Sequence, residues 1–170
     1  MSHPRSIVLF GYGNPSRGDD ALGPLLLARA EAWVAERPGL GVRVVEDFQL
    51  QIEHAEDLRD QDLALFLDAD AAALGPCRLR QVLPTRDESY TTHELSPGAV
   101  LEVFERVSGR VAPPAFVLGL RAVAFDLGAP LSPAAEASLE AGWALLRHLL
   151  EHPDPEAWMA HLTAVGPAVE

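Results

Sequence analysis

Residues 6–18, with the sequence SIVLFGYGNPSRG, decide the fold of this chain. The stretch opens with an apolar run, which is typical of a strand buried on both faces, as strands of parallel sheets are. Glycines and a proline follow and predict a loop, after which a helix is expected to open near Asp19. The order of strand, loop and helix is the start of an α/β pattern.

The same alternation of short apolar runs and helical segments continues to about residue 150. Right-handed crossovers between parallel strands place helices on both faces of a sheet. We therefore expect a three-layer α/β/α sandwich around a twisted, mostly parallel sheet of about five strands. Residues 78–83 alternate polar and apolar side chains, so this strand is expected at an edge, where an antiparallel direction fits. The other strands are expected at 42–45, 63–67 and 115–119, and helices are expected to begin near 19, 52, 97 and 133.

The length of 170 residues favours a single α/β domain over 1–170, with a core at about 5–151 and a tail at 153–170. Hydrophobic residues make up 48% of the chain and charged residues 22%, which is a globular balance. No apolar run approaches the roughly 20 residues that span a bilayer, and no secretory signal opens the sequence. The single cysteine, Cys77, excludes an internal disulfide and a multi-cysteine metal cage. We therefore expect a cytoplasmic protein with no membrane partner.

The charge balance is strongly acidic. The formal net charge is −12, and all 13 of the Lys+Arg residues are arginines. A phosphate backbone would be repelled by the average surface, so nucleic acid is excluded as a partner. The absence of lysine also excludes a P-loop and a Schiff-base enzyme. A bound cation or a basic protein fits this charge better.

The candidate site consists of side chains that the fold brings to one rim of the sheet. If the strand order begins 2-1-3, the carboxyl ends of strands 1 and 3 meet at a switch point, where open α/β sheets bind ligands. That order brings Asp19 and Asp20 beside Asp68, and the edge strand delivers His93 to the same rim. Asp20, Asp68 and His93 would give a metal ion two oxygen ligands and one nitrogen ligand, with positions left open for substrate. Each residue type also has an ordinary alternative as a helix cap, a strand-end turn residue or a surface histidine.

The loop after the first strand allows two interpretations. Asn14 is the only asparagine of the chain, and we expect it to organise this loop beneath the aspartate pair. Gly11-x-Gly13 also suggests a nucleotide-binding domain. An acidic residue at the end of the second strand is consistent with this alternative. The third glycine of that fingerprint is missing, because Ser16 takes its place, and two aspartates would oppose a pyrophosphate.

Other catalytic arrangements find no support in the sequence. It contains neither the HExxH motif of zinc peptidases nor the GxSxG elbow of serine hydrolases. Cys77 has no base near it in the sequence, so a structural thiol is expected. Four other histidines are expected to be solvated, namely His54, His148, His152 and His161.

The chain resembles the hydrogenase maturation endopeptidases of nickel–iron hydrogenases. The resemblance rests on the motif GxGNxxxGDDxxG at residues 11–23, on the strand end Leu-Asp-Ala at 67–69, and on His93 ahead of a helix. Residues 117–119 and 131–133 also resemble the last strand and the last helix start of that family. The resemblance covers about residues 7–150, and the first motif is its most specific part.

The resemblance implies a function. Such enzymes remove a C-terminal extension from the hydrogenase large-subunit precursor after nickel has been inserted, and the nickel is the recognition signal. By position, the residues that meet the nickel are Asp20, Asp68 and His93, whereas Asp19 is structural. The nickel would be supplied by the precursor, with none permanently bound, and the precursor would be the partner. Residues 46–50 depart from the family's Gly-Gly-Thr run, and a non-catalytic nickel-binding maturation module is the alternative.

Overall fold

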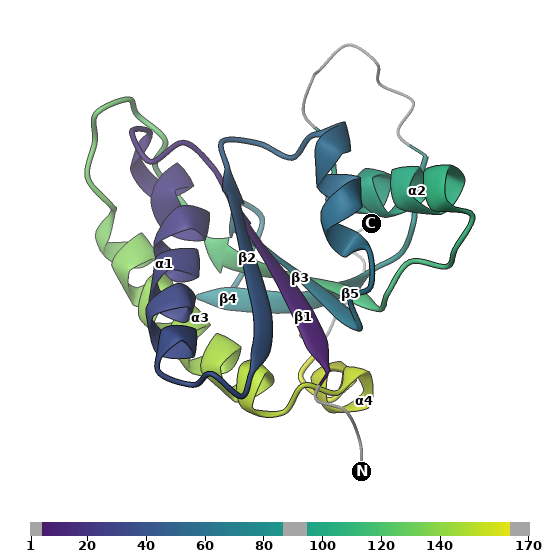
Figure 1. Cartoon of the computed structure of the whole chain (residues 1–170). Coiled ribbons are helices and arrows are strands. Elements are labelled where there is room, and N and C mark those ends of the chain that lie inside the picture. Colours follow the sequence, from purple (N-terminus) through teal and green to yellow (C-terminus); the bar gives the residue numbers. More distant parts are fainter. Residues whose placement is uncertain (1–4, 87–94, 164–170) are drawn as a thin grey trace.

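The computed structural model describes residues 5–86 and 95–163. Its strands are β1 (Ser6–Tyr12), β2 (Gly41–Asp47), β3 (Leu63–Asp70), β4 (Cys77–Val82) and β5 (Ala115–Arg121). They form one sheet in the order β2-β1-β3-β5-β4 (Figure 1). Neighbouring strands are parallel except β4 and β5, which are antiparallel. The mostly parallel sheet with one antiparallel edge strand is therefore confirmed.

Helices cover both faces of this sheet. The 3-10 helices are η1 (Gly18–Ala21) and η2 (Ile52–Leu58), and the α-helices are α1 (Leu22–Ala35), α2 (Pro97–Ser108), α3 (Pro133–Glu151) and α4 (Pro155–Met159). Helices α1 and α3 lie on one face, and η2 and α2 lie on the other (Figure 1). The three-layer α/β/α sandwich is thus confirmed. Of the helices in the described ranges, none is long and apolar enough to cross a membrane.

Each face of the sheet has its own apolar core, because successive side chains of a strand point to opposite faces. In β3, Leu63, Leu65 and Leu67 pack in the core beneath α1 and α3. Ala64 and Phe66 point the other way and pack in the core beneath η2 and α2. All five side chains are fully buried. The continuous apolar run therefore marks a strand that is covered on both faces, as expected from the sequence.

The start of α1 lies directly on the backbone of the two central strands. A Cβ atom added at Gly23 would lie 2.5 Å from the Tyr12 carbonyl oxygen and 2.7 Å from the Leu67 carbonyl oxygen. Only a glycine permits this close approach, since the atoms it faces are backbone. The approach holds η1, which directly precedes α1, against the carboxyl ends of β1 and β3.

The apolar core extends past the expected limit near residue 151. Trp158 is fully buried, and its indole N–H lies 2.9 Å from the carbonyl oxygens of both Leu149 and His152. Thr163 pairs with Leu79 of the edge strand β4, because each residue accepts a hydrogen bond from the backbone N–H of the other. Edge strands leave backbone N–H and C=O groups unpaired, and Thr163 pairs with two of these groups on β4.

Candidate active site

The candidate site lies at the switch point between β1 and β3, as the strand order predicts. β1 pairs in parallel with β2 on one side and with β3 on the other. The carboxyl ends of the three strands therefore lie at the same edge of the sheet. Asp20 lies in η1, which contacts β3 at this edge. Asp68 lies in β3, one residue beyond the Leu67 that pairs with Gly11 of β1. The two aspartates are therefore placed at the same edge of the sheet.

The Asp20 carboxylate is oriented by a hydrogen bond from the loop that follows β1. Its Oδ2 accepts a 2.6 Å hydrogen bond from the backbone N–H of Asn14. Gly13 has a φ of 144°, and a Cβ added there would lie 2.1 Å from the Asp20 carbonyl oxygen, so glycine is required. The half-buried Asp20 uses Oδ2 for this bond, and within the described ranges its Oδ1 makes no hydrogen bond. Oδ1 is therefore available to an external ligand.

Asn14 organises the loop beneath Asp20, as expected from its being the only asparagine. Its side-chain oxygen accepts a 2.9 Å hydrogen bond from the N–H of Ser16, and its carbonyl oxygen accepts one of 3.1 Å from Arg17. The side-chain bond is an Asx turn, which fixes the backbone after Asn14. The same geometry disfavours the nucleotide-binding interpretation, because the Asp20 carboxylate already occupies an N–H that a phosphate would need.

Asp19, in contrast, is a structural residue. It is fully buried, and its carboxylate accepts four hydrogen bonds from the loop between β5 and α3: the backbone N–H groups of Val123, Ala124 and Ser132, and the Ser132 hydroxyl, at 2.7–3.1 Å. Burial opposes ionisation, but the hydrogen bonds outweigh it and hold the pKa of Asp19 below its ordinary value. Asp19 thus ties η1 to the β5–α3 loop, and this supports the structural role expected for it.

Asp68 is half-buried and faces the α2 side of the sheet, following the alternation of Ala64 and Phe66. The strand was expected to end near this residue, but β3 continues to Asp70. Asp70 forms an ion pair with Arg78 of β4, and Nη2 of Arg78 lies 3.1 Å from its Oδ1. A Cβ added at Gly119 of β5 would lie 2.5 Å from Asp70 Oδ2. The Asp70 carboxylate therefore lies directly above this glycine, between β3 and β4. Asp70 therefore stabilises the sheet through Arg78, and Asp68 stays the candidate for chemistry at this end of β3.

His93 lies outside the described residues, so its convergence with Asp20 and Asp68 stays a prediction. The described chain resumes at Leu95, whose N–H donates a 3.3 Å hydrogen bond to the Leu50 carbonyl oxygen just beyond β2. The chain therefore enters α2 at the same edge of the sheet as the two aspartates. Within 5–86 and 95–163, three metal-ligating side chains do not come together at any point.

One histidine expected to be solvated is buried instead. His54 is only 7% exposed, and its Nδ1 accepts a 2.8 Å hydrogen bond from the backbone N–H of Gln51. The proton of the neutral ring is therefore on Nε2, which lies 3.3 Å from Oδ2 of Asp47. The two contacts fix the turn between β2 and η2, at the edge that carries Asp20. Gln51 and His54 form a capping box at the start of η2, but neither is a residue type that this motif normally uses at its position, so the motif could not be recognised from the sequence.

Several solved structures that share this fold are named as hydrogenase maturation proteases or peptidases. The protease HycI from Thermococcus kodakarensis superposes with a TM-score of 0.67 and 23% sequence identity, covering 88% of this chain and 95% of that chain. The endopeptidase HybD from E. coli gives 0.65 and 19%, covering 87% and 93%. The hydrogenase 2 maturation peptidase from a Thaumarchaeota archaeon gives 0.58 and 19%, covering 86% and 98%.

The likeness to these proteases covers nearly the whole described chain, which therefore has the fold of hydrogenase maturation proteases. The fold implied by the motif at residues 11–23 is thereby confirmed. No family model and no curated protein matches the chain. At these levels of identity the likeness concerns the fold, and the chemistry must be argued from the site.

Proposed function

We propose that this protein is an endopeptidase that removes the C-terminal extension of a nickel–iron hydrogenase large-subunit precursor after nickel insertion. The observation that carries the proposal is the placement of Asp20 and Asp68 at the β1/β3 switch point. Proteins with the same fold are named as maturation proteases and endopeptidases, and this supports the reaction class.

In the proposed reaction, Asp20, Asp68 and His93 contact nickel that the precursor already holds. Carboxylate oxygens and an imidazole nitrogen suit a divalent cation of this kind. The contact positions the scissile peptide against the enzyme, so that the metal acts as a template. The hydrogen bond from Asn14 orients the Asp20 carboxylate in advance and leaves Oδ1 toward the substrate. The strongly acidic chain also attracts a cationic centre.

Processing of a nickel-loaded precursor tests the proposal. We expect Asp20→Asn, Asp68→Asn and His93→Gln each to abolish the mass shift of the precursor while leaving the circular dichroism spectrum unchanged. Asp60→Asn is the matched control, since Asp60 is an exposed residue preceding β3 at the opposite edge. Its positive φ of 62° is a conformation that asparagine tolerates. Processing at the wild-type rate by all three site variants would refute the proposal.

A second measurement distinguishes the peptidase from a non-catalytic nickel-binding protein. Titration of the purified protein with Ni²⁺ alone is expected to give only weak binding, because the proposed ligands contact a metal that the substrate supplies. Tight binding of free Ni²⁺ together with an uncleaved precursor would favour a nickel-binding maturation module instead.

A further inference from the structure

A groove of about 200 Å³ runs between η2 and α2, on the α2 side of the sheet. Its apolar lining comes from both elements: Ile52, Ala55, Val103, Phe104 and Val107. Val103 and Phe104 each lie about one helical turn before Val107, so the three residues of α2 share one face of the helix. Ile52 is 63% exposed and Val107 is 74% exposed, so apolar surface on both walls is open to solvent.

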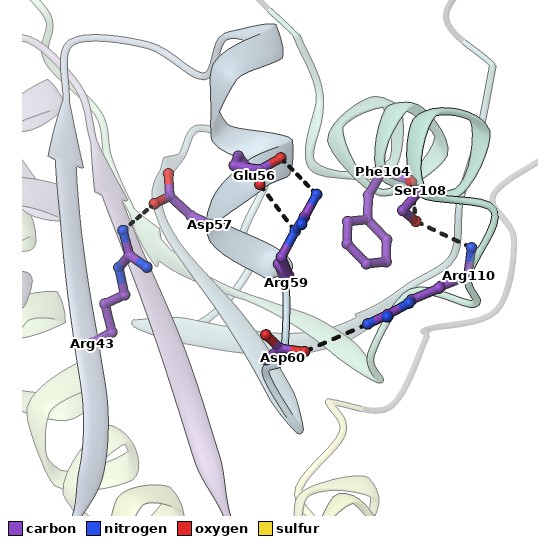
Figure 2. Close-up of polar contacts among 8 residues, drawn as sticks. All are labelled: Arg43, Glu56, Asp57, Arg59, Asp60, Phe104, Ser108 and Arg110. Atoms are coloured by element: carbon purple, nitrogen blue, oxygen red, sulfur yellow. Dashed lines mark hydrogen bonds and ion pairs between the residues drawn. The ribbon is translucent and has the colours of Figure 1, made fainter.

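Apart from Glu53, the polar side chains that line the groove have partners within the protein. Arg59 forms an ion pair with Glu56, with Nε 2.9 Å from Oε1 (Figure 2). The Ser108 hydroxyl donates a 2.6 Å hydrogen bond to the Phe104 carbonyl oxygen and accepts one from the backbone N–H of Arg110 (Figure 2). These groups are satisfied internally, so the groove suits apolar side chains better than a polar small molecule.

Two further hollows lie along the chain between the groove and the loop that holds Asp20. Ile52 and Glu53, which line the groove, also line a neighbouring hollow with Gln49 and Gln51. The second hollow lies between the end of β2 and the loop that holds Asp20, and it is lined by Gly13, Pro15, Glu46, Asp47 and Phe48. Phe48 is 68% exposed, although the turn that carries it is fixed by His54. A segment bound at Asp20 can therefore continue along this surface into the groove.

The charge of the surface selects the kind of occupant. Glu53 is exposed on the rim of the groove, and Glu46 and Asp47 line the hollow beside Phe48. A second copy of this chain would bring a formal charge of −12 against −12, which opposes self-association. An apolar segment that also carries basic side chains complements both the lining and the rim.

We propose that the η2–α2 groove is a docking surface for the protein substrate: it binds an apolar segment with basic flanking residues, away from the bond that is cleaved. This inference rests on the proposed function and adds to it a second contact site for the same partner. Binding at a surface separate from the cleaved bond lowers KM without changing the chemical step, since it stabilises ground state and transition state equally.

The test is the Val107→Arg variant, compared with Val111→Arg. Val111 is 87% exposed and lies outside the groove lining, so the two variants add the same charge at equally accessible valines. An arginine in the last turn of α2 is compatible with the helix dipole, which protects the fold. With the hydrogenase large-subunit precursor as substrate, we expect Val107→Arg to raise KM about tenfold at unchanged kcat. Val111→Arg should stay within about twofold of the wild type.

Binding of the same precursor, measured by biolayer interferometry, separates failure of the docking surface from failure of the proposed function. If the wild type cleaves and both valine variants behave alike, the docking surface is refuted and the proposed function stands. If the wild type binds without cleaving and only Val107→Arg weakens binding, the surface stands and the peptidase proposal fails. A wild-type chain that neither binds nor cleaves would overturn both proposals. A wild-type dimer that Val107→Arg dissociates would assign the groove to self-association and refute the docking of substrate.

Discussion

Ser132 donates two hydrogen bonds to Asp19 across 113 residues of sequence, one from its backbone N–H at 2.8 Å and one from its hydroxyl at 2.7 Å. Ser132 is also the N-cap of α3, and its Oγ accepts the N–H of Ala135. One serine therefore joins the turn that carries Asp20 to the start of the last long helix. Asp19 and Asp20 are neighbours in sequence, yet they perform different tasks, and this separation can be tested.

Asp19→Ala is expected to lower the free energy of unfolding by about 2–4 kcal/mol, because it leaves three partly buried N–H groups and a hydroxyl without their acceptor. Asp20→Ala removes the acceptor for a single N–H, so its loss of stability is expected to be smaller, about 1 kcal/mol. At low temperature, where both variants are folded, Asp20→Ala should lose more processing activity than Asp19→Ala. Urea denaturation measures the first quantity. Equal destabilisation by the two substitutions would contradict the division of roles.

The stabilising effect of Asp19 is expected to depend on pH. Its pKa is lowered in the folded protein, since the hydrogen bonds to its carboxylate outweigh burial. The unfolded chain then binds the extra proton first as the pH falls, so the stabilisation is complete well above about pH 4 and is lost as the pH falls through the folded pKa. The difference in unfolding free energy between the wild type and Asp19→Asn should therefore narrow from pH 7 toward pH 3. A difference that stays constant over this range would rule out the ionised carboxylate as its source.

The close approach of α1 to the sheet gives a prediction about a residue that touches no substrate. Gly23→Ala would place a Cβ atom within 2.7 Å of two backbone carbonyl oxygens, which cannot rotate away. We expect a loss of about 1–3 kcal/mol in unfolding free energy, and a loss of about 10- to 100-fold in processing as η1 and Asp20 shift. Gly39→Ala is the matched control, because a Cβ there meets nothing within 4 Å. Gly23→Ala should therefore be less stable and less active than Gly39→Ala. Equal stability and equal processing in the two variants would contradict the close approach of α1 to the sheet as a constraint.

The sequence was sufficient for the fold class because its central strands, β1, β3 and β5, are buried on both faces. The apolar runs in β1 and β3 favour a covered parallel sheet, whereas the 2-1-3 order is a condition of the predicted site, which the structure meets. The placement of Asp20 and Asp68 at one edge then needs only the strand ends. The role of Asp19 could be suggested only by resemblance, since its hydrogen-bond donors lie more than 100 residues away in the sequence.

Two features were less accessible from the sequence, for physical reasons. His54 is polar and was expected in water, but local capping of η2 and the carboxylate of Asp47 satisfy both ring nitrogens and so permit burial. The end of β3 was placed too early, because Asp70 does not look like a strand residue. Its charge is compensated by Arg78 on another strand, and such a pairing is visible only after the strands are placed.

Residues 153–163 were expected to belong to a tail outside the core, because the predicted helix there is short and follows a proline. The structure buries Trp158 completely against Phe116, with ring centroids 5.3 Å apart. We expect Trp158→Ala to lower the unfolding free energy by about 3–5 kcal/mol, through the lost packing and the lost indole hydrogen bond. Met159→Ala is the control in the same short helix, and its side chain is 41% exposed, so the expected loss is below about 1 kcal/mol. Thermal and urea unfolding of both variants measure this difference. Similar stabilities would mean that this segment does not contribute to the core.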